Sequence, residues 1–162
     1  MRTEVVVSGI PKQWFLVDAK DQVLGRLASQ IAAVLKGKNR PTYAPSVTGD
    51  AVIVVNADKI RLTGRKAEQK IYYQHSGYPG GLRATAAGKM MARRPEYVIR
   101  EAVRGMLPKN PLGRACLRNL RIYRGGAHRH TAQQPQPLVL AGRSPGGNGA
   151  AKAGRTTKGR DA

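Results

Sequence analysis

The chain has 162 residues, and its 29 Lys and Arg side chains against 9 Asp and Glu give a formal net charge of +20 at pH 7. This charge far exceeds what solubility requires and indicates a polyanionic partner. No run approaches the roughly 20 apolar residues of a membrane-spanning helix, no signal-peptide segment is visible, and a single cysteine excludes an internal disulfide. We therefore expect a cytosolic domain that binds nucleic acid and has no membrane partner.

A strand and a helix are predicted first along the chain. Residues 14–17 form a compact apolar run, and either Asp18 or Asp21 can cap a helix that begins near residue 22. Apolar side chains recur with a period near 3.6 over residues 22–36, and Gly37 follows where a terminating glycine is expected. The pattern predicts an amphipathic helix with one face against a core.

A second strand, buried on both faces, is expected at residues 50–56. Its sequence, DAVIVVN, is an uninterrupted β-branched run of the kind found in parallel strands covered by helices. Residues 59–62 and 71–73 alternate polar and apolar side chains and predict further strands, with a short helix over 63–70 between them. Residues 76–81, SGYPGG, must form a loop. The first strand, helix and second strand together indicate a βαβ unit.

Two consecutive helices are expected between residues 85 and 106. Thr85 can cap the first, which runs to Arg93, and Pro95 suits the first position of the second. The inward stripe of the second helix is predicted to hold Val98 or Ile99, Ala102, Val103 and Met106. The side chains predicted to share another face are Arg93, Arg100 and Arg104.

A proline-stiffened corner is predicted after these helices. Pro108 and Pro111 stop the second helix, and between them Lys109 and Asn110 are held outward. A further short helix follows, and its apolar stripe is predicted to hold Leu112, Cys116 and Leu120. On a different side of this helix lie Arg114, Arg118 and Arg121. Residues 122–123 predict one more short strand. We expect this corner to make the principal contact with the polyanion.

The pattern as a whole predicts a single α/β domain with two flanking segments. Residues 14–140 hold all the expected elements, and residues 1–13 precede them as an N-terminal extension. Residues 141–162 are rich in glycine and basic side chains and poor in large apolar ones, so they cannot bury enough surface to offset the entropy of ordering. We expect them to form a disordered tail.

An α/β domain invites an enzymatic hypothesis, because ligands in such folds bind at the carboxyl ends of the parallel strands. Asp18, Asn56 and Asp58 would lie there, but such side chains at strand ends are far more often caps and turn formers. The sequence contains neither a G-x-G-x-x-G fingerprint nor a G-x-x-x-x-G-K-[ST] loop. His128 and His130 lack the further ligands of a zinc site. We expect no catalytic residue, cofactor, metal or small-molecule substrate.

The basic side chains differ in how readily the chain itself can neutralise them. Glutamates three or four residues away can pair with Arg100 and Arg104. We expect Arg100 to form an ion pair with Glu96, and Arg104 to have no local partner. Lys36, Lys38 and Arg40 can simply complement the negative end of a helix dipole. The basic residues with almost no acidic neighbour in sequence, for which phosphate contact is favoured over solvation, are Arg93, Arg94, Lys109, Arg114, Arg118, Arg121 and Arg124.

Three tyrosines lie near the glycine-rich loop. Tyr72, Tyr73 and Tyr78 stand beside His75, and an aromatic or histidine side chain can stack on an unpaired base where the glycines let backbone approach. For Tyr72 and Tyr73, filling the face of a sheet is an equally good interpretation. The aromatic residues expected in the core are Trp14, Phe15 and Tyr123.

Three segments resemble large ribosomal subunit protein 13 of the bacterial or organellar type. They are WFLVDAKDQVLGRLASQIAAVLKGK, DAVIVVNADKIRLTGRKAEQKIYYQHSGYPGG and, most specifically, VRGMLPKNPLGR. The likeness runs from about Trp14 to about Gly126, in order and without large gaps, which makes chance agreement implausible.

The resemblance implies a three-layer α/β sandwich with a small, mostly parallel central sheet flanked by helices, and no enzymatic activity. It also implies binding to large-subunit ribosomal RNA early in assembly. The residues that match its motifs, and that would face RNA or shape the loops that do, are Lys66, Lys70, His75, Tyr78, Arg104, Lys109, Asn110 and Arg114. The tail after about Arg143 departs from the common family length.

We therefore expect a structural constituent of the large ribosomal subunit, in the cytoplasm, that binds ribosomal RNA, stabilises its folding during early assembly and adjoins neighbouring ribosomal proteins. The residues alone leave open a generic basic module that binds DNA or messenger RNA and, less favoured, an α/β enzyme acting on RNA. The expected RNA contacts are Lys36, Lys38, Arg40, Arg65, Lys66, Lys70, His75, Tyr78, Arg83, Arg93, Arg94, Arg104, Lys109, Asn110, Arg114, Arg118, Arg121 and Arg124.

Overall fold

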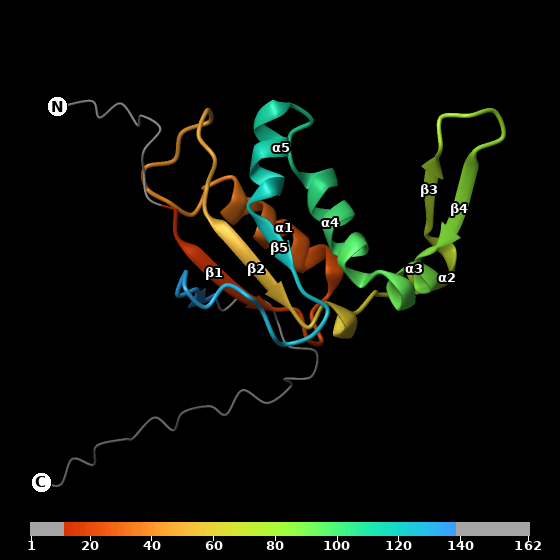
Figure 1. Cartoon of the computed structure of the whole chain (residues 1–162), viewed down its shortest axis with the longest axis horizontal. Helices are drawn as coiled ribbons and strands as arrows, with labels where there is room; N and C mark the ends of the chain where they lie inside the picture. Colours follow the sequence, from red (N-terminus) through yellow and green to blue (C-terminus); the bar gives the residue numbers. More distant parts are fainter. Residues whose placement is uncertain (1–11, 139–162) are drawn as a thin grey trace, which may run out of the picture.

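A parallel sheet with helices packed against it forms one part of the molecule, and a β-hairpin projects from it as the other (Figure 1). The structure, a computed structural model, describes residues 12–138. The strands of the sheet, in the spatial order β5-β2-β1-β6, are β1 (Trp14–Asp18), β2 (Ala51–Val55), β5 (Leu120–Ile122) and β6 (Gln136–Pro137). Every neighbouring pair is parallel. The predicted α/β class is confirmed, whereas the expected tail lies outside the described residues.

The predicted βαβ unit is present as β1, α1 (Leu24–Leu35) and β2. β1 and β2 pair in parallel, and every residue of β2 is buried, as its β-branched composition predicts. Helix α1 ends as expected, because Gly37 follows its last turn with a φ of +77°, a conformation that glycine adopts without strain. The first strand, the first helix and the second strand were therefore predictable from the pattern of their apolar residues.

The expected cap of α1 is wrong. The N-cap position is Val23, and no side chain caps this helix end. Asp18 instead accepts a hydrogen bond from the Lys20 backbone N–H at 2.9 Å, and Asp21 sits in a left-handed turn with a φ of +58°. Both aspartates shape the turn because the helix begins two residues later than the sequence pattern suggested.

The segment after β2 forms helical turns where a strand was expected. Lys59 ends the short 3₁₀ helix η1 (Ala57–Lys59), and Arg61 makes only an isolated bridge with Val23. Ile60 is 4% exposed, so the alternation at residues 59–62 reflects one buried anchor and not a strand ladder. The short helix expected within residues 63–70 is confirmed as α2 (Lys66–Gln69).

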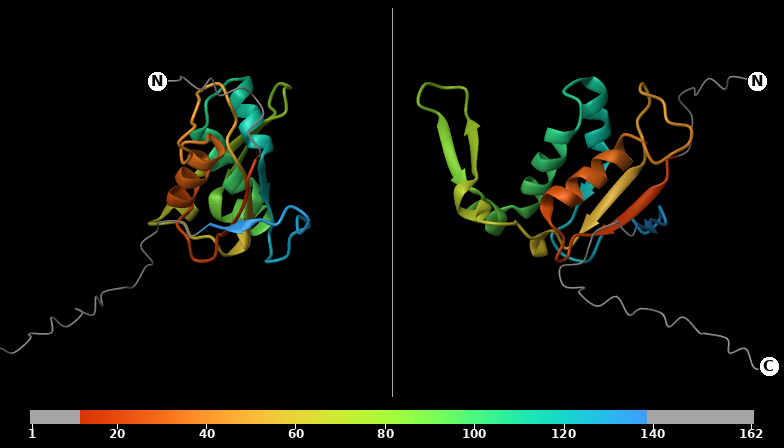
Figure 2. Two further views of the ribbon diagram at one scale, coloured as in Figure 1. Left: turned by 90° about the vertical axis from the view of Figure 1, so that its left-hand side faces the viewer. Right: turned by 180° about the vertical axis from the view of Figure 1, so that it is seen from behind.

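The projecting hairpin consists of β3 (Ile71–His75) and β4 (Leu82–Ala86), joined by the predicted loop at residues 76–81. Thr85 lies in β4 opposite Tyr72 and does not cap helix α3 (Ala87–Arg93). The capping prediction failed because a β-branched threonine suits a strand as well as a cap. Figure 2 shows the hairpin standing away from the sheet in a second orientation.

Helices α4 (Pro95–Met106) and α5 (Pro111–Arg118) carry the segment between the hairpin and β5. α4 packs against α1, and α5 contacts both α4 and β5. Val98, Ile99 and Val103 are fully buried as predicted, but Met106 is 47% exposed and does not belong to the core stripe. Leu120 is buried as part of β5 and not of α5, because α5 ends at Arg118.

An aromatic cluster ties the end of the described chain to the sheet. The rings of Trp14 and His130 stack at a centroid distance of 5.3 Å, and Tyr123 meets His130 edge to face at 6.0 Å. Trp14 and Tyr123 are therefore half-buried against a histidine, whereas Phe15 is in the core as predicted.

Candidate nucleic-acid interface

The corner between α4 and α5 is held by its own backbone and side chains. Pro111 occupies the first turn of α5, and the side-chain oxygen of Asn110 accepts a hydrogen bond from the Gly113 N–H at 2.8 Å. Gly113 is buried, and a Cβ added there would lie 1.8 Å from the carbonyl oxygen of Pro108. Only glycine lets the two backbones approach so closely. The corner is a rigid feature, and the Asn110 carbonyl is engaged in the cap.

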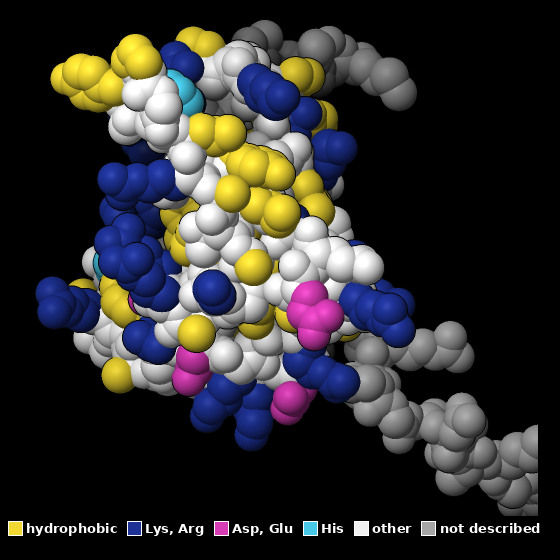
Figure 3. Space-filling view, turned by 90° about the vertical axis from the view of Figure 1, so that its right-hand side faces the viewer, with side chains coloured by type: hydrophobic (Ala, Val, Ile, Leu, Met, Phe, Trp, Pro, Cys, Tyr) yellow, Lys and Arg dark blue, Asp and Glu magenta, His cyan; other side chains and the backbone are white. Residues whose placement is uncertain are grey.

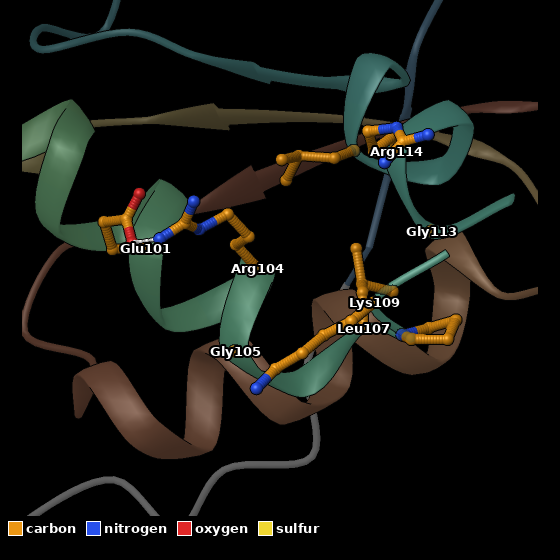
Figure 4. Close-up of a pocket in the computed structure, with 9 residues that line it drawn as sticks. Glu101, Arg104, Gly105, Leu107, Lys109, Gly113 and Arg114 are labelled. Carbon is orange, nitrogen blue, oxygen red and sulfur yellow. Dashed lines mark ion pairs between the residues drawn. The ribbon is translucent and has the colours of Figure 1, made fainter. Parts of the chain in front are cut away.

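A groove of about 570 Å³ opens beside this corner. Its charged lining comes from consecutive segments: Arg104 from α4, Lys109 from the connecting loop and Arg114 from α5 (Figure 4). Leu107, Pro108 and Leu117 supply apolar surface, and one acidic residue, Glu101, also lines the groove. Cations from three segments thus surround one concave surface.

Two expectations about arginine partners are reversed. Arg104 pairs with Glu101 at 2.6 Å from Nη2 to Oε2, although its side chain is 65% exposed. Within the described residues no ion pair joins Glu96 to Arg100, and Arg100 is exposed. Sequence spacing allowed both pairs, and it is the i to i+3 pair that forms. Lys109 and Arg114 are therefore the groove's most available cations.

A second basic hollow, of about 720 Å³, lies on the other side of α4. Lys66 and Lys70 line it as expected contacts, and Arg26 and Arg61 line it without having been predicted. It shares Glu101 and Gly105 with the groove, so the two hollows adjoin along α4. The signal for the two missed arginines was weak: Arg26 sits on the polar face of α1, and Arg61 alternates with apolar neighbours.

Arg40 and Arg124 make internal contacts that sequence reasoning did not foresee. Arg40 forms an ion pair with Asp50, which is completely buried and also accepts the Gln13 backbone N–H at 2.9 Å. Arg124 donates from Nη2 to the carbonyl of Ala92 at 3.1 Å, which joins the segment after β5 to the last turn of α3. Part of each guanidinium is therefore used to hold the fold.

The other candidate contacts are spread over the surface. All the predicted contact residues except Lys36 and Arg40 are exposed. His75, Tyr78 and Arg83 lie on the hairpin, and Arg93 and Arg94 lie at the junction of α3 and α4. The remaining ones, after α1, before α2, or on α5 or β5, are Lys36, Lys38, Arg65, Arg118 and Arg121. The structure therefore brings some of the candidate residues together at the corner groove and at the second hollow. It does not bring all of them together into one continuous site.

The aspartates at the strand ends have structural partners. Burial alone would raise the pKa of Asp18, but hydrogen bonds from the Asn56 amide and the Lys20 N–H outweigh it and leave the pKa below its ordinary value. Asp18 is thus an ionised acceptor in a turn. Among the described residues, no group of three or more His, Cys, Asp and Glu side chains is placed to hold a metal ion.

Membrane insertion has no support in the described helices, since none of them is both long and apolar enough to cross a bilayer.

Comparison with known proteins identifies the family to which this chain belongs. The family model described as Ribosomal protein L13 matches residues 12–129. This chain belongs to the L13 family. The large ribosomal subunit protein uL13 of Pelobacter propionicus is 58% identical over 142 residues, which cover 86% of this chain and 100% of that protein. The uL13 proteins of Trichlorobacter lovleyi and Alteromonas mediterranea are each 56% identical, over 86% and 81% of this chain and 100% and 93% of their own lengths.

The family resemblance suspected from three sequence segments is thereby confirmed. The region matched by the L13 model contains every candidate contact residue, from Lys36 to Arg124, together with both hollows and the hairpin. It ends before the final residues of the chain, so residues 141–162 stand outside the L13 match.

Proposed function

We propose that this protein is a structural constituent of the large ribosomal subunit, where it binds ribosomal RNA and stabilises RNA folding early in assembly. The groove at the α4–α5 corner is the observation on which the proposal rests, because it presents Arg104, Lys109 and Arg114 around one concave surface. The relatives are named as large ribosomal subunit proteins, which supports the same partner. The site of action is then the ribosome, among neighbouring large-subunit proteins.

The mechanism is neutralisation of phosphates by preorganised cations. Lys109 and Arg114 are exposed, and the corner that carries them is fixed by Pro111, the Asn110 cap and the tight approach at Gly113. A rigid backbone loses little conformational entropy on binding, so more of the electrostatic gain appears as affinity. The arginine guanidinium adds two parallel hydrogen bonds to a phosphate.

The second hollow extends this mechanism to another stretch of RNA. Arg26, Arg61, Lys66 and Lys70 face it from α1, the loop before α2, and α2 itself with the residue that follows. Because the hollow and the corner groove adjoin along α4, one RNA strand or two neighbouring strands can occupy both. Binding two RNA segments to one rigid helix would hold those segments in a fixed relative position, which is how the protein would stabilise a folded RNA.

The same features argue for a binding role without turnover. Asp18 accepts hydrogen bonds from Asn56 and Lys20, so its carboxylate is engaged in the turn after β1. Asp18→Asn and Asp58→Asn should accordingly leave RNA association intact.

Affinity for different nucleic acids tests the proposal. At physiological salt the protein should bind large-subunit ribosomal RNA more tightly than unrelated RNA of equal length or duplex DNA, because a fixed set of cations fits one folded shape. Filter binding with the three nucleic acids measures this. Equal affinities would instead favour a generic basic module, and a turnover of RNA that is lost in Asp18→Asn or Asp58→Asn would favour an enzyme.

A further inference from the structure

The β3–β4 hairpin exposes an apolar face. Strand pairing sets Ile71, Tyr73 and His75 on one side together with their partners Ala86, Ala84 and Leu82. Ile71 is 44% exposed, Tyr73 62% and Leu82 60%. Figure 3 shows hydrophobic side chains gathered over this side of the molecule, with Lys and Arg side chains around them. Such a face on a two-stranded hairpin calls for a ligand, because two strands alone are marginally stable in water.

The opposite face of the hairpin is the one attached to the body. Tyr72 points to that side, where its ring meets Tyr97 of α4 edge to face at 6.2 Å, and it is packed against the core. The Lys70 ammonium lies 5.1 Å from the centre of the Tyr72 ring. The hairpin is thus anchored through Tyr72. Its Tyr73 face stays exposed and is free to contact a ligand.

The geometry around Tyr73 suits a flat ligand. Its partner across the hairpin is Ala84, which leaves the ring unobstructed by a large neighbour. The His75 ring is held in place because its Nδ1 accepts the Gly77 N–H at 2.9 Å, so Nε2 carries the proton and can donate outward. At the tip, Tyr78 is 76% exposed beside Gly80, whose φ is +71°. Two open aromatic rings and a fixed imidazole therefore line one small hairpin.

The charge around the hairpin distinguishes the class of ligand. Residues 65–93 contain six Lys and Arg side chains and a single acidic one, Glu68. Arg83 pairs with Gln74 on the Tyr72 side of the hairpin, and Lys66 and Lys70 line the second hollow, so these cations lie on the opposite face and at the base of the hairpin. An apolar protein segment would cover Ile71 and Leu82 but would leave those nearby cations unneutralised. A single-stranded nucleic acid supplies bases for the rings and phosphates for the cations at once.

We propose that the Tyr73 face and Tyr78 form a stacking platform for unpaired RNA bases. The corner groove and the second hollow bind phosphates, whereas the hairpin binds bases, so it recognises single-stranded RNA. Stacking does not depend on base identity, since every base has an aromatic face. This inference rests on the proposed function and adds that the nucleotides bound by the hairpin are unpaired ones.

Substitutions at the two tyrosines test the platform in the full-length protein. The probes are a single-stranded oligoadenylate and a blunt RNA duplex of the same length, and fluorescence anisotropy gives the affinities. Tyr73→Ala and Tyr78→Ala should each weaken binding of the single strand by about 5- to 150-fold, the loss expected for one stacked base. Duplex binding and the salt dependence of both probes should stay unchanged.

Conservative variants separate stacking from simple apolar contact. Tyr73→Phe keeps the flat ring and should bind like the original protein, whereas Tyr73→Leu keeps apolar bulk without a ring and should bind as weakly as Tyr73→Ala. Tyr43→Leu, at an exposed tyrosine distant in sequence from the hairpin, is the matched control. Unfolding curves verify that the variants fold, which the exposure of both sites favours.

Each contrary outcome has a distinct meaning. Tyrosine variants that bind the single strand normally would overturn the platform, while a preserved preference for large-subunit RNA would leave the proposed function standing. If those variants bind RNA normally but enter reconstituted large subunits poorly, a protein neighbour covers the face and the platform is again overturned. Loss of the preference for large-subunit RNA in the original protein would instead remove the proposed function itself.

Discussion

The α4–α5 corner requires glycine at position 113, because its backbone leaves no room there for a Cβ atom. We predict that Gly113→Ala lowers the free energy of unfolding by about 1–3 kcal/mol, because the added Cβ would lie 1.8 Å from the Pro108 carbonyl oxygen and the backbones must separate. Urea unfolding measures the change.

Gly105→Ala is the matched control for that substitution. Gly105 lies in α4, and a Cβ there meets nothing within 4 Å. Alanine should therefore stabilise the protein, by up to about 1 kcal/mol, because it has the higher helix propensity. Equal effects of the two substitutions would contradict the close approach at the corner.

Tyr72 carries a buried hydroxyl for which no hydrogen-bond partner exists among the described residues. Removing an unsatisfied polar group recovers part of its desolvation cost, so Tyr72→Phe should raise the free energy of unfolding by about 1 kcal/mol. Urea unfolding at neutral pH is the test. A destabilised Phe variant would show that the hydroxyl has a partner.

The same hydroxyl gives a pH dependence. Burial raises the pKa of Tyr72, and the nearby Glu101 carboxylate raises it further. The stabilisation from keeping the group protonated is complete below the ordinary pKa of 10.0 and is lost as the pH rises through the raised value, since the unfolded chain ionises first. Tyr72→Phe should lose less stability than the original protein above pH 10, and parallel alkaline curves would contradict this.

At the scale of elements, the ion pair between Arg40 and Asp50 connects the segment after α1 to the start of β2. Asp50 is completely buried, so Arg40→Ala would leave an uncompensated charge and should cost about 3–5 kcal/mol of stability. Breaking the exposed pair at Arg104 with Glu101→Ala should change stability by less than about 1 kcal/mol. Thermal unfolding of both variants makes the comparison, and similar costs would show that Arg40 is not structurally engaged.

Local patterns predicted the elements whose burial has a regular period. α1, β2 and α4 follow directly from apolar spacing, and Pro95 marks the start of α4 as predicted. Pro111 was predicted only to help stop α4, but it also begins α5. The hairpin was predicted only in part, because its apolar face is exposed and Thr85 fits a cap and a strand equally.

Long-range contacts were not predictable from spacing. Arg40 and Asp50 are ten residues apart, and nothing local shows that the chain between them folds back. β6 carries only Gln136 and Pro137 and pairs with β1 far earlier in the chain, so it has no apolar pattern of its own. The corner cations were predicted as a group, whereas Arg26 and Arg61 join the second hollow only through tertiary packing.

At the scale of the whole molecule, the formal charge of +20 leads us to expect that electrostatics dominates the proposed affinity for ribosomal RNA. Binding to ribosomal RNA should weaken as salt rises, with a log–log slope of about 0.7–0.9 for each phosphate neutralised. Charge alone, however, is spread from the corner to the hairpin and the sheet ends. The specific expectation is that removing two cations at the corner matters more than removing two elsewhere.

The most direct measurement compares two double variants of equal charge on large-subunit ribosomal RNA over a range of salt concentrations. Lys109→Ala with Arg114→Ala removes two of the three corner-groove cations and leaves Arg104, which pairs with Glu101. Lys20→Ala with Lys59→Ala removes two exposed cations near the carboxyl ends of β1 and β2, away from the corner in Figure 1. We predict that the corner variant loses affinity and that its slope falls by about 1.4–1.8, while the control variant changes little. Equal losses in the two variants would contradict a principal RNA contact at the corner.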